Sequence, residues 1–133
     1  MKKILALILT ATMALGLAGC GGSSNTSSNG TSSDSKKAKF HIGIVTGTVA
    51  QSEDELRGAE AFIKEYGDAD KGGIVKHVTY PDNFMQEQET TIAQIAGLAD
   101  DPDMKAIIVN QSVPGTVAAF KKIRERRPDI LLF

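Results

Sequence analysis

The chain has 133 residues, of which 41% are hydrophobic, with 15 lysines and arginines against 16 aspartates and glutamates. The net charge of −1 excludes the strongly basic surface with which a nucleic-acid-binding domain neutralises phosphates, so no nucleic-acid partner is expected. The single cysteine, Cys20, excludes a disulfide within the chain.

The N-terminus has the pattern of an export signal. Lys2 and Lys3 precede an uncharged, mostly apolar run from Ile4 to Leu17. The run is shorter than the roughly 20 residues that a membrane-spanning helix needs, and no stop-transfer pattern follows it. Residues 1–19 are therefore predicted to be a signal peptide that is not part of the fold.

The residues Leu17-Ala18-Gly19-Cys20 resemble the lipobox of bacterial lipoproteins. In that pattern the cysteine is diacylated and becomes the new N-terminus. An unmodified Cys20 at a mature N-terminus would be a reactive free thiol, which also favours lipidation. The resemblance implies an extracytoplasmic protein that is anchored to the bacterial cell membrane through Cys20. The alternative is an ordinary signal peptide with a chance cysteine at its end.

Residues 20–38 are predicted to form a lipidated N-terminus and a flexible tether. The stretch from Gly21 to Ser35 is almost entirely Gly, Ser, Asn and Thr, so it lacks apolar side chains whose burial could offset the entropy of ordering it. A flexible linker of this length spans roughly 20 Å, which places the following domain outside the membrane.

The first predicted strand is Phe40 to Thr46, which is short and rich in β-branched residues. Ser52 and Glu55 form a capping-box pattern for a helix that ends at Gly67. The residues that share one face of this helix are Leu56, Ala59, Phe62, Ile63 and Tyr66.

A second strand is predicted over Ile74 to Tyr80 and a third over Lys105 to Asn110. Asn83 and Gln86 offer a capping pair for the helix between these strands. The apolar face expected for that helix consists of Met85, Ile92, Ile95, Ala96 and Ala99.

The third helix follows Pro114 and stops before Pro128, and it is expected to carry Val117, Phe120 and Ile123 inward. Ile130 to Phe133 opens a fourth strand, and no turn, cap or polar tail follows. The chain is therefore expected to be truncated within that strand.

Regular alternation of apolar strands and one-faced helices predicts an α/β fold with a doubly wound parallel sheet. Such sheets bind ligands beyond the carboxyl ends of their strands, near the point where the strand order reverses. The candidate ligand-binding residues after the first three strands are Thr46, Gly47, Thr48, Tyr80, Asp82, Asn83, Asn110, Gln111 and Ser112.

Enzyme and cofactor motifs fit the sequence less well. Gly43 and Gly47 are spaced G-x-x-x-G instead of the dinucleotide pattern G-x-G-x-x-G, and no phosphate-binding P-loop occurs. An alternative is a stand-alone protein that resembles flavodoxin and binds a flavin phosphate through Thr46, Thr48 and Ser52 at a helix N-terminus.

Metal and catalytic centres are not predicted. His41 and His77 lie within strands without a partner at ligand spacing, and no Ser/His/Asp constellation can be assembled. The acidic turn Asp100 to Asp103 lies at the opposite end of the sheet and is interpreted as a solvated loop. The basic cluster on the third helix is interpreted as a solvated face, and it contains Lys121, Lys122, Arg124, Arg126 and Arg127.

The segments FHIGIVTGT, ELRGAEAFIKEYG and MKAIIVNQSVPGTVAAF, after a lipobox and a Ser-rich tether, resemble the N-terminal lobe of type I periplasmic binding proteins. More narrowly, they resemble an uncharacterised bacterial lipoprotein family related to such components of ABC importers. The resemblance implies that residues 39–133 form a partial lobe, and it selects the same loops for ligand binding. It also implies a small polar solute and an ABC permease as partners. No aromatic residue follows the first strand, which speaks against a sugar.

Overall fold

The computed structural model describes residues 40–133 of the chain. The predicted signal peptide, the lipidation of Cys20 and the tether lie outside these residues. Within the described part, no helix has the length and the apolar character needed to cross a membrane.

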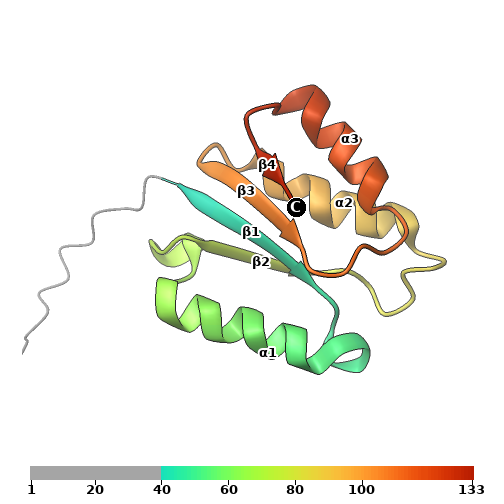
Figure 1. Ribbon diagram of the computed structural model, residues 1–133, viewed down its shortest axis with the longest axis horizontal. Coiled ribbons are helices and arrows are strands. Elements are labelled where there is room, and N and C mark those ends of the chain that lie inside the picture. Colours follow the sequence, from blue (N-terminus) through green and yellow to red (C-terminus); the bar gives the residue numbers. More distant parts are fainter. Residues whose placement is uncertain (1–39) are drawn as a thin grey trace, which may run out of the picture. The chain divides into compact units, whose positions relative to one another are not determined.

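The described residues form a sheet of four parallel strands in the order β2-β1-β3-β4 (Figure 1). The strands are β1 (His41–Thr46), β2 (Val75–Thr79), β3 (Met104–Val109) and β4 (Leu131–Leu132). The chain first adds β2 on one side of β1 and then returns to add β3 on the other side. The strand order therefore reverses between β1 and β3, and the predicted doubly wound α/β fold is confirmed.

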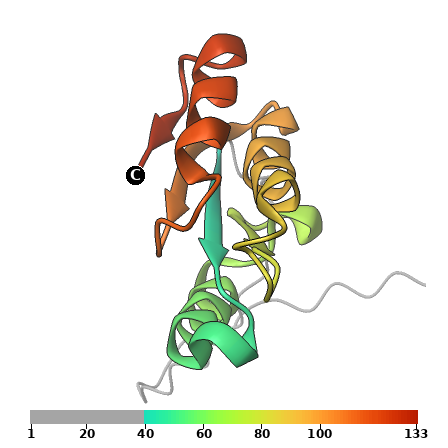
Figure 2. The same ribbon diagram turned by 90° about the vertical axis from the view of Figure 1, so that its right-hand side faces the viewer.

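The helices lie on both faces of the sheet (Figures 1 and 2). The first, α1 (Val49–Tyr66), contacts β1 and β2. The other two, α2 (Gln88–Gly97) and α3 (Thr116–Arg126), pack against each other on the opposite face. Two short 3-10 helices, η1 (Ala69–Lys71) and η2 (Leu98–Asp100), lead into β2 and β3.

The main core lies between the sheet and the helices α2 and α3. Val45 and Ile107 of the two central strands are fully buried there, together with Ile95 of α2 and Ile123 of α3. Glycine at position 43 allows Leu98 and Ile107 to pack closely against β1, because a Cβ atom there would lie 3.0 Å from Leu98 and 3.2 Å from Ile107. Alternation along the strands thus directs one set of apolar residues towards α2 and α3.

The face of the sheet that carries α1 is only partly covered. Ile44 and its register partner Ile108 lie on this face, and Ile108 is 38% exposed. The side chains of Leu131 and Phe133 near the C-terminal end are also exposed. Because α1 contacts β1 and β2, the region over β3 remains open beside the helix.

Helix α2 begins later than the capping pattern predicts. The N–H groups of Gln86 and Glu87 donate to the carbonyl of Asn83 in a turn, and the helix starts only at Gln88. Met85 lies in this turn with 58% exposure, so its predicted place on the apolar face is wrong. Phe84 occupies the space over the core instead, edge-on to the Tyr80 ring at 5.5 Å between centroids.

Helix α3 packs Ile123 and the partly buried Phe120 against the core as predicted, but not Val117. Val117 is 65% exposed, whereas Thr116, Ala119 and Ile123 are buried, so the prediction that Val117 faces inward is wrong. The helix starts from Gly115 at φ 101°, where an added Cβ atom would lie 3.0 Å from the Gln88 carbonyl oxygen. This close contact with α2 fixes the starting orientation of α3.

Candidate functional site

The three loops selected from the sequence meet at the carboxyl edge of the sheet. The N–H of Tyr80 donates to the carbonyl of Thr46 at 3.1 Å, which joins the ends of β2 and β1. The N–H of Asn110 donates to the carbonyl of Val45 at 3.0 Å, which joins the ends of β3 and β1. The fold therefore brings all three loops to the point where the strand order reverses.

The first and second loops are linked by polar side chains. The Thr48 hydroxyl donates a hydrogen bond to the Asp82 carboxylate. The Gln51 side-chain amide donates to the backbone carbonyl of Asp82 at 2.6 Å. Gln51 was not selected from the sequence, because a polar residue in the first turn of a helix carries no signal of its own. Asp82 and Asn83 are exposed and form an accessible rim.

Tyr80 lies beneath the rim and does not face solvent. It is fully buried, and its hydroxyl donates to the Gln111 side-chain oxygen at 2.8 Å. Burial raises the pKa of Tyr80, and the negative charge of Glu55 raises it further. Gly47 is required here, because a Cβ atom at this position would lie 2.9 Å from the Tyr80 hydroxyl. Tyr80 and Gly47 thus support Gln111, which is exposed together with Ser112.

Thr46 is also buried, and its hydroxyl is engaged within the protein. It donates to the carbonyl of Gly47 at 2.9 Å and lies 2.9 Å from Nε2 of His77. Since the hydroxyl proton is used on Gly47, His77 donates its Nε2 proton to Thr46. Burial lowers the pKa of His77 and so favours the neutral ring. The negative charge of Glu60 has the opposite effect but does not outweigh burial.

A cavity of about 380 Å³ opens beside this edge, between α1 and the uncovered face of the sheet. Its apolar walls include Ile44, Ile108 and Phe62, and its polar groups come from Thr46, Glu55 and Asn110. Oxygen Oε2 of Glu55 is buried there and has no hydrogen-bond partner among residues 40–133. Thr46 and Asn110 connect the cavity to the predicted ligand-binding residues.

Glu55 is placed in the cavity by a kink in α1. Ser52 has non-helical backbone angles, φ −160° and ψ 81°, so a first turn from Val49 is followed by the main part of the helix. The extended backbone of Ser52 agrees with its predicted capping position. In residues 40–133, however, no hydrogen bond connects the side chains of Ser52 and Glu55 to the helix end, so the reciprocal capping box is absent. Glu55 instead points its carboxylate into the cavity.

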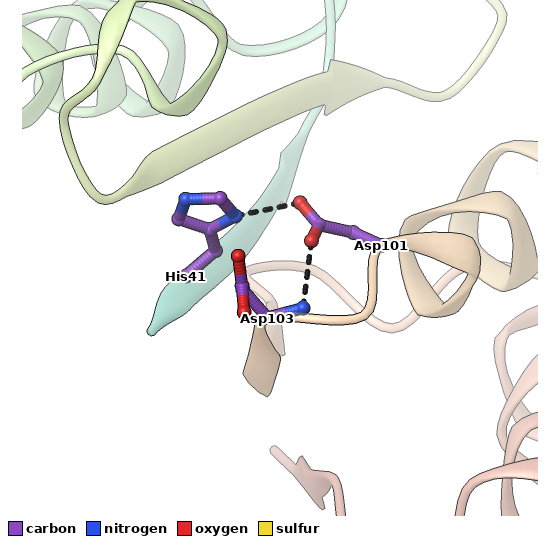
Figure 3. Close-up of side chains that lie close together, drawn as sticks. All are labelled: His41, Asp101 and Asp103. Carbon is purple, nitrogen blue, oxygen red and sulfur yellow. Dashed lines mark hydrogen bonds and ion pairs between the residues drawn. The ribbon is translucent and has the colours of Figure 1, made fainter. Parts of the chain in front are cut away.

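The amino edge of the sheet holds a second polar cluster (Figure 3). Nδ1 of His41 lies 2.7 Å from Oδ2 of Asp101, and both side chains are 9% exposed. The Asp103 N–H donates to the other Asp101 oxygen at 2.9 Å. The interpretation of this turn as a solvated loop is therefore wrong for Asp101. This contact is not evident from the sequence, because His41 and Asp101 are 60 residues apart.

Burial alone would raise the pKa of Asp101. The hydrogen bonds from His41 and the Asp103 N–H, with the charges of His41 and Lys76, outweigh burial and hold this pKa below its ordinary value. His41, Asp101 and Asp103 each offer a metal-ligand atom within 4.8 Å of the others. The Lys76 ammonium lies 3.8 Å from Asp101 and supplies positive charge, so the cluster is described as an ion-pair network.

Arg127 completes the amino edge. Its guanidinium donates to the backbone carbonyls of Ala99, Asp101 and Met104 and pairs with the Asp129 carboxylate. The hydrogen bond from Arg127 lowers the pKa of Asp129 to about 2, against the effect of desolvation. The prediction of a solvated basic face is therefore wrong for Arg127, because the guanidinium satisfies the carbonyl groups of the turn before β3.

The fold and its carboxyl edge define a doubly wound α/β protein with a flavodoxin-like arrangement. The chain belongs to the family described as protein of unknown function DUF3798, whose model matches residues 40–133. This agrees with the resemblance to a family of unknown function that the sequence suggests.

Similar proteins occur in Treponema pallidum (strain Nichols). One uncharacterised protein is 41% identical over 96 residues, which is 71% of this chain and 43% of that relative. Another is 56% identical over 36 residues, which is 27% of this chain and 17% of that relative. The chain therefore spans less than half the length of these relatives.

A solved structure shares the fold. The crystal structure of a candidate transcriptional regulator from Clostridium difficile 630 matches 71% of this chain and 28% of its own, with 29% identity and a TM-score of 0.63. The matched part is about a quarter of that protein, so the likeness concerns the fold of residues that the two chains share.

Proposed function

We propose that the chain is the solute-binding part of a lipid-anchored extracytoplasmic protein of the ABC-importer receptor type, and not an enzyme. The observation that carries this proposal is the position of a cavity beside the exposed polar groups at the strand-order reversal. Ligand sites in parallel α/β sheets occur at this position, and cavities of about 300–1,000 Å³ suit small ligands. An ABC permease is the partner that such a receptor would require.

The alternative of a flavin phosphate at the first loop has weaker support. The Thr46 hydroxyl is buried and donates to Gly47, so it is not available to a phosphate. The Thr48 hydroxyl donates to Asp82, whose negative charge would repel a phosphate. The geometry of this loop therefore favours a neutral or positively charged ligand.

Substitution of a polar residue at the rim or at the mouth of the cavity is expected to abolish solute binding. A thermal-shift screen of the full chain with amino acids, nucleosides, sugars, small carboxylates and amines is the first step. A ligand at 100 times its dissociation constant adds about 2.7 kcal/mol of stability. Asp82→Ala and Asn110→Ala should each remove the shift, because these side chains line the rim and the cavity mouth.

Asp54→Ala is the matched control, since Asp54 is an exposed carboxylate on α1 and is not among the residues that line the cavity. It should keep the full shift. An unchanged shift in both Asp82→Ala and Asn110→Ala would show that the ligand binds elsewhere, and no shift with any solute class would refute the proposed function.

Membrane attachment is expected to depend on Cys20. In a bacterial host, Cys20→Ala should move the exported protein from the membrane fraction to the soluble extracytoplasmic fraction, because the acyl chains supply the attachment. Ser23→Ala, a neighbouring substitution in the tether, is the control and should leave the protein in the membrane fraction. Equal membrane retention of Cys20→Ala and the unsubstituted chain would contradict lipidation at Cys20.

A further inference from the structure

The cavity beside α1 contains a carboxylate that no side chain of residues 40–133 neutralises. Oxygen Oε2 of Glu55 is buried and has no hydrogen-bond partner in the described residues. Buried polar atoms in folded proteins nearly always have partners, and a buried unpaired carboxylate oxygen is unfavourable. A ligand that donates a hydrogen bond to Glu55 would remove this unfavourable state.

The basic side chain nearest in sequence is already paired elsewhere. Arg57 binds Glu60 at 2.7 Å and Glu53 at 3.4 Å on the outer surface of α1. The ion pairs found among residues 40–133 do not include Glu55. The charge partner of Glu55 is therefore expected to come from outside these residues.

The remaining lining of the cavity is mainly apolar. Ile44 and Ile108 form the floor on the sheet, and Phe62 lies on the wall formed by α1. A cavity of about 380 Å³ is large enough for a compact ring or a short alkyl chain. Charge complementarity to Glu55 selects a cation and disfavours an anion, whereas the apolar walls disfavour a strongly hydrated metal ion.

We propose that the cavity binds a small solute that carries a primary ammonium group on an apolar body, with Glu55 as the charge partner. The ammonium group would donate to Oε2 of Glu55, while the apolar body would contact Ile44, Phe62 and Ile108. This inference rests on the proposed solute-binding function and names the chemical class of the solute. It also gives a role to Glu55, which the sequence pattern assigns only to helix capping.

Benzylamine is a suitable probe, with benzyl alcohol and benzoate as neutral and anionic controls that keep the same ring. Titration calorimetry on the full chain should show benzylamine binding at least ten-fold more tightly than benzyl alcohol, and benzoate should not bind. Glu55→Gln should reduce the affinity for benzylamine by about 10- to 100-fold, because the substitution removes the negative charge that pairs with the ammonium group. It should leave benzyl alcohol unchanged.

The position of the ligand can be tested by filling the cavity. Gly58 lines the cavity, and a Cβ atom added there would meet no other atom within 4 Å. Gly58→Leu is therefore expected to fold and to block benzylamine. Gly97→Leu is the matched control, because Gly97 has the same free space around an added Cβ atom but lies on α2. Circular dichroism would verify that both variants and Glu55→Gln remain folded.

The possible results separate the two proposals. Equal affinities for benzylamine and benzyl alcohol, or no effect of Glu55→Gln, would overturn the role of Glu55. Binding of a neutral or acidic solute that depends on Asp82, without binding of benzylamine, would overturn only the amine class. Failure of every solute to bind would overturn both proposals, including the case in which another part of a longer protein fills the cavity.

Discussion

Ile107→Ala is expected to lower the free energy of unfolding by about 3–4 kcal/mol, which is the usual cost of truncating a fully buried isoleucine. Ile107 is 0% exposed on β3, a central strand, and belongs to the core cluster between the sheet and the helices α2 and α3. Truncation would leave a void beside Gly43, and because glycine has no side chain, this residue cannot fill the void. Urea unfolding monitored by circular dichroism would measure the change.

Ile108→Ala provides the matched control on the same strand. Ile108 points to the opposite face, where it is 38% exposed, so its truncation should cost less than about 1 kcal/mol. The two variants remove the same atoms at adjacent positions of one strand, so a difference in their stability can be attributed to burial. A larger loss for Ile108→Ala than for Ile107→Ala would show that the two faces of β3 are exchanged, as in a register shifted by one residue. Similar losses in the two variants would contradict burial as the cause.

Asp101→Asn is expected to destabilise the protein by about 1–3 kcal/mol at neutral pH, the range for losing hydrogen bonds to a charged group. The 9% exposed Asp101 carboxylate accepts from the Asp103 N–H, and Oδ2 lies near His41 and Lys76. Asparagine keeps the shape of the side chain but removes its negative charge. Chemical denaturation at a series of pH values would measure the difference.

The pH dependence of this difference has a definite sign. The folded-state pKa of Asp101 is lowered, whereas the unfolded-state value is about 3.9. The stabilisation is therefore complete above pH ~4 and is lost as the pH falls through the folded-state pKa. The wild-type protein should lose its advantage over Asp101→Asn in that acidic range.

Asp103→Asn is the control for this second prediction, because its backbone N–H still donates to Asp101. It should change stability by less than about 0.5 kcal/mol. A constant difference between wild type and Asp101→Asn from neutral pH to strongly acidic pH would contradict the lowered pKa of Asp101.

The positions of the strands along the chain and their parallel direction could be predicted because they depend on local patterns. The run from Phe40 to Thr46 and the run from Lys105 to Asn110 are short, apolar and β-branched, and the observed strands differ from them by only a residue at the ends. Alternation with helices then requires parallel strands. The meeting of the first, second and third loops at one edge follows from the same topology.

The side-chain contacts that distinguish the two ends of the sheet could not be predicted in this way. The contact between His41 and Asp101 joins residues 60 positions apart and depends on the register of β1 with β3. The place of Glu55 depends on the backbone kink at Ser52, which is not evident from a capping pattern. Burial of Tyr80 likewise depends on the space that Gly47 leaves above it.

Arg127 gives the two ends of the sheet different tolerance to sequence change. Its guanidinium holds three backbone carbonyl groups at the amino edge, so replacement of this residue affects the path of the chain itself. At the carboxyl edge, Asp82, Asn83 and Ser112 are exposed, and their side chains do not support the core. Substitutions at the carboxyl edge are therefore expected to leave the scaffold intact, whereas substitution of Arg127 is expected to disturb it.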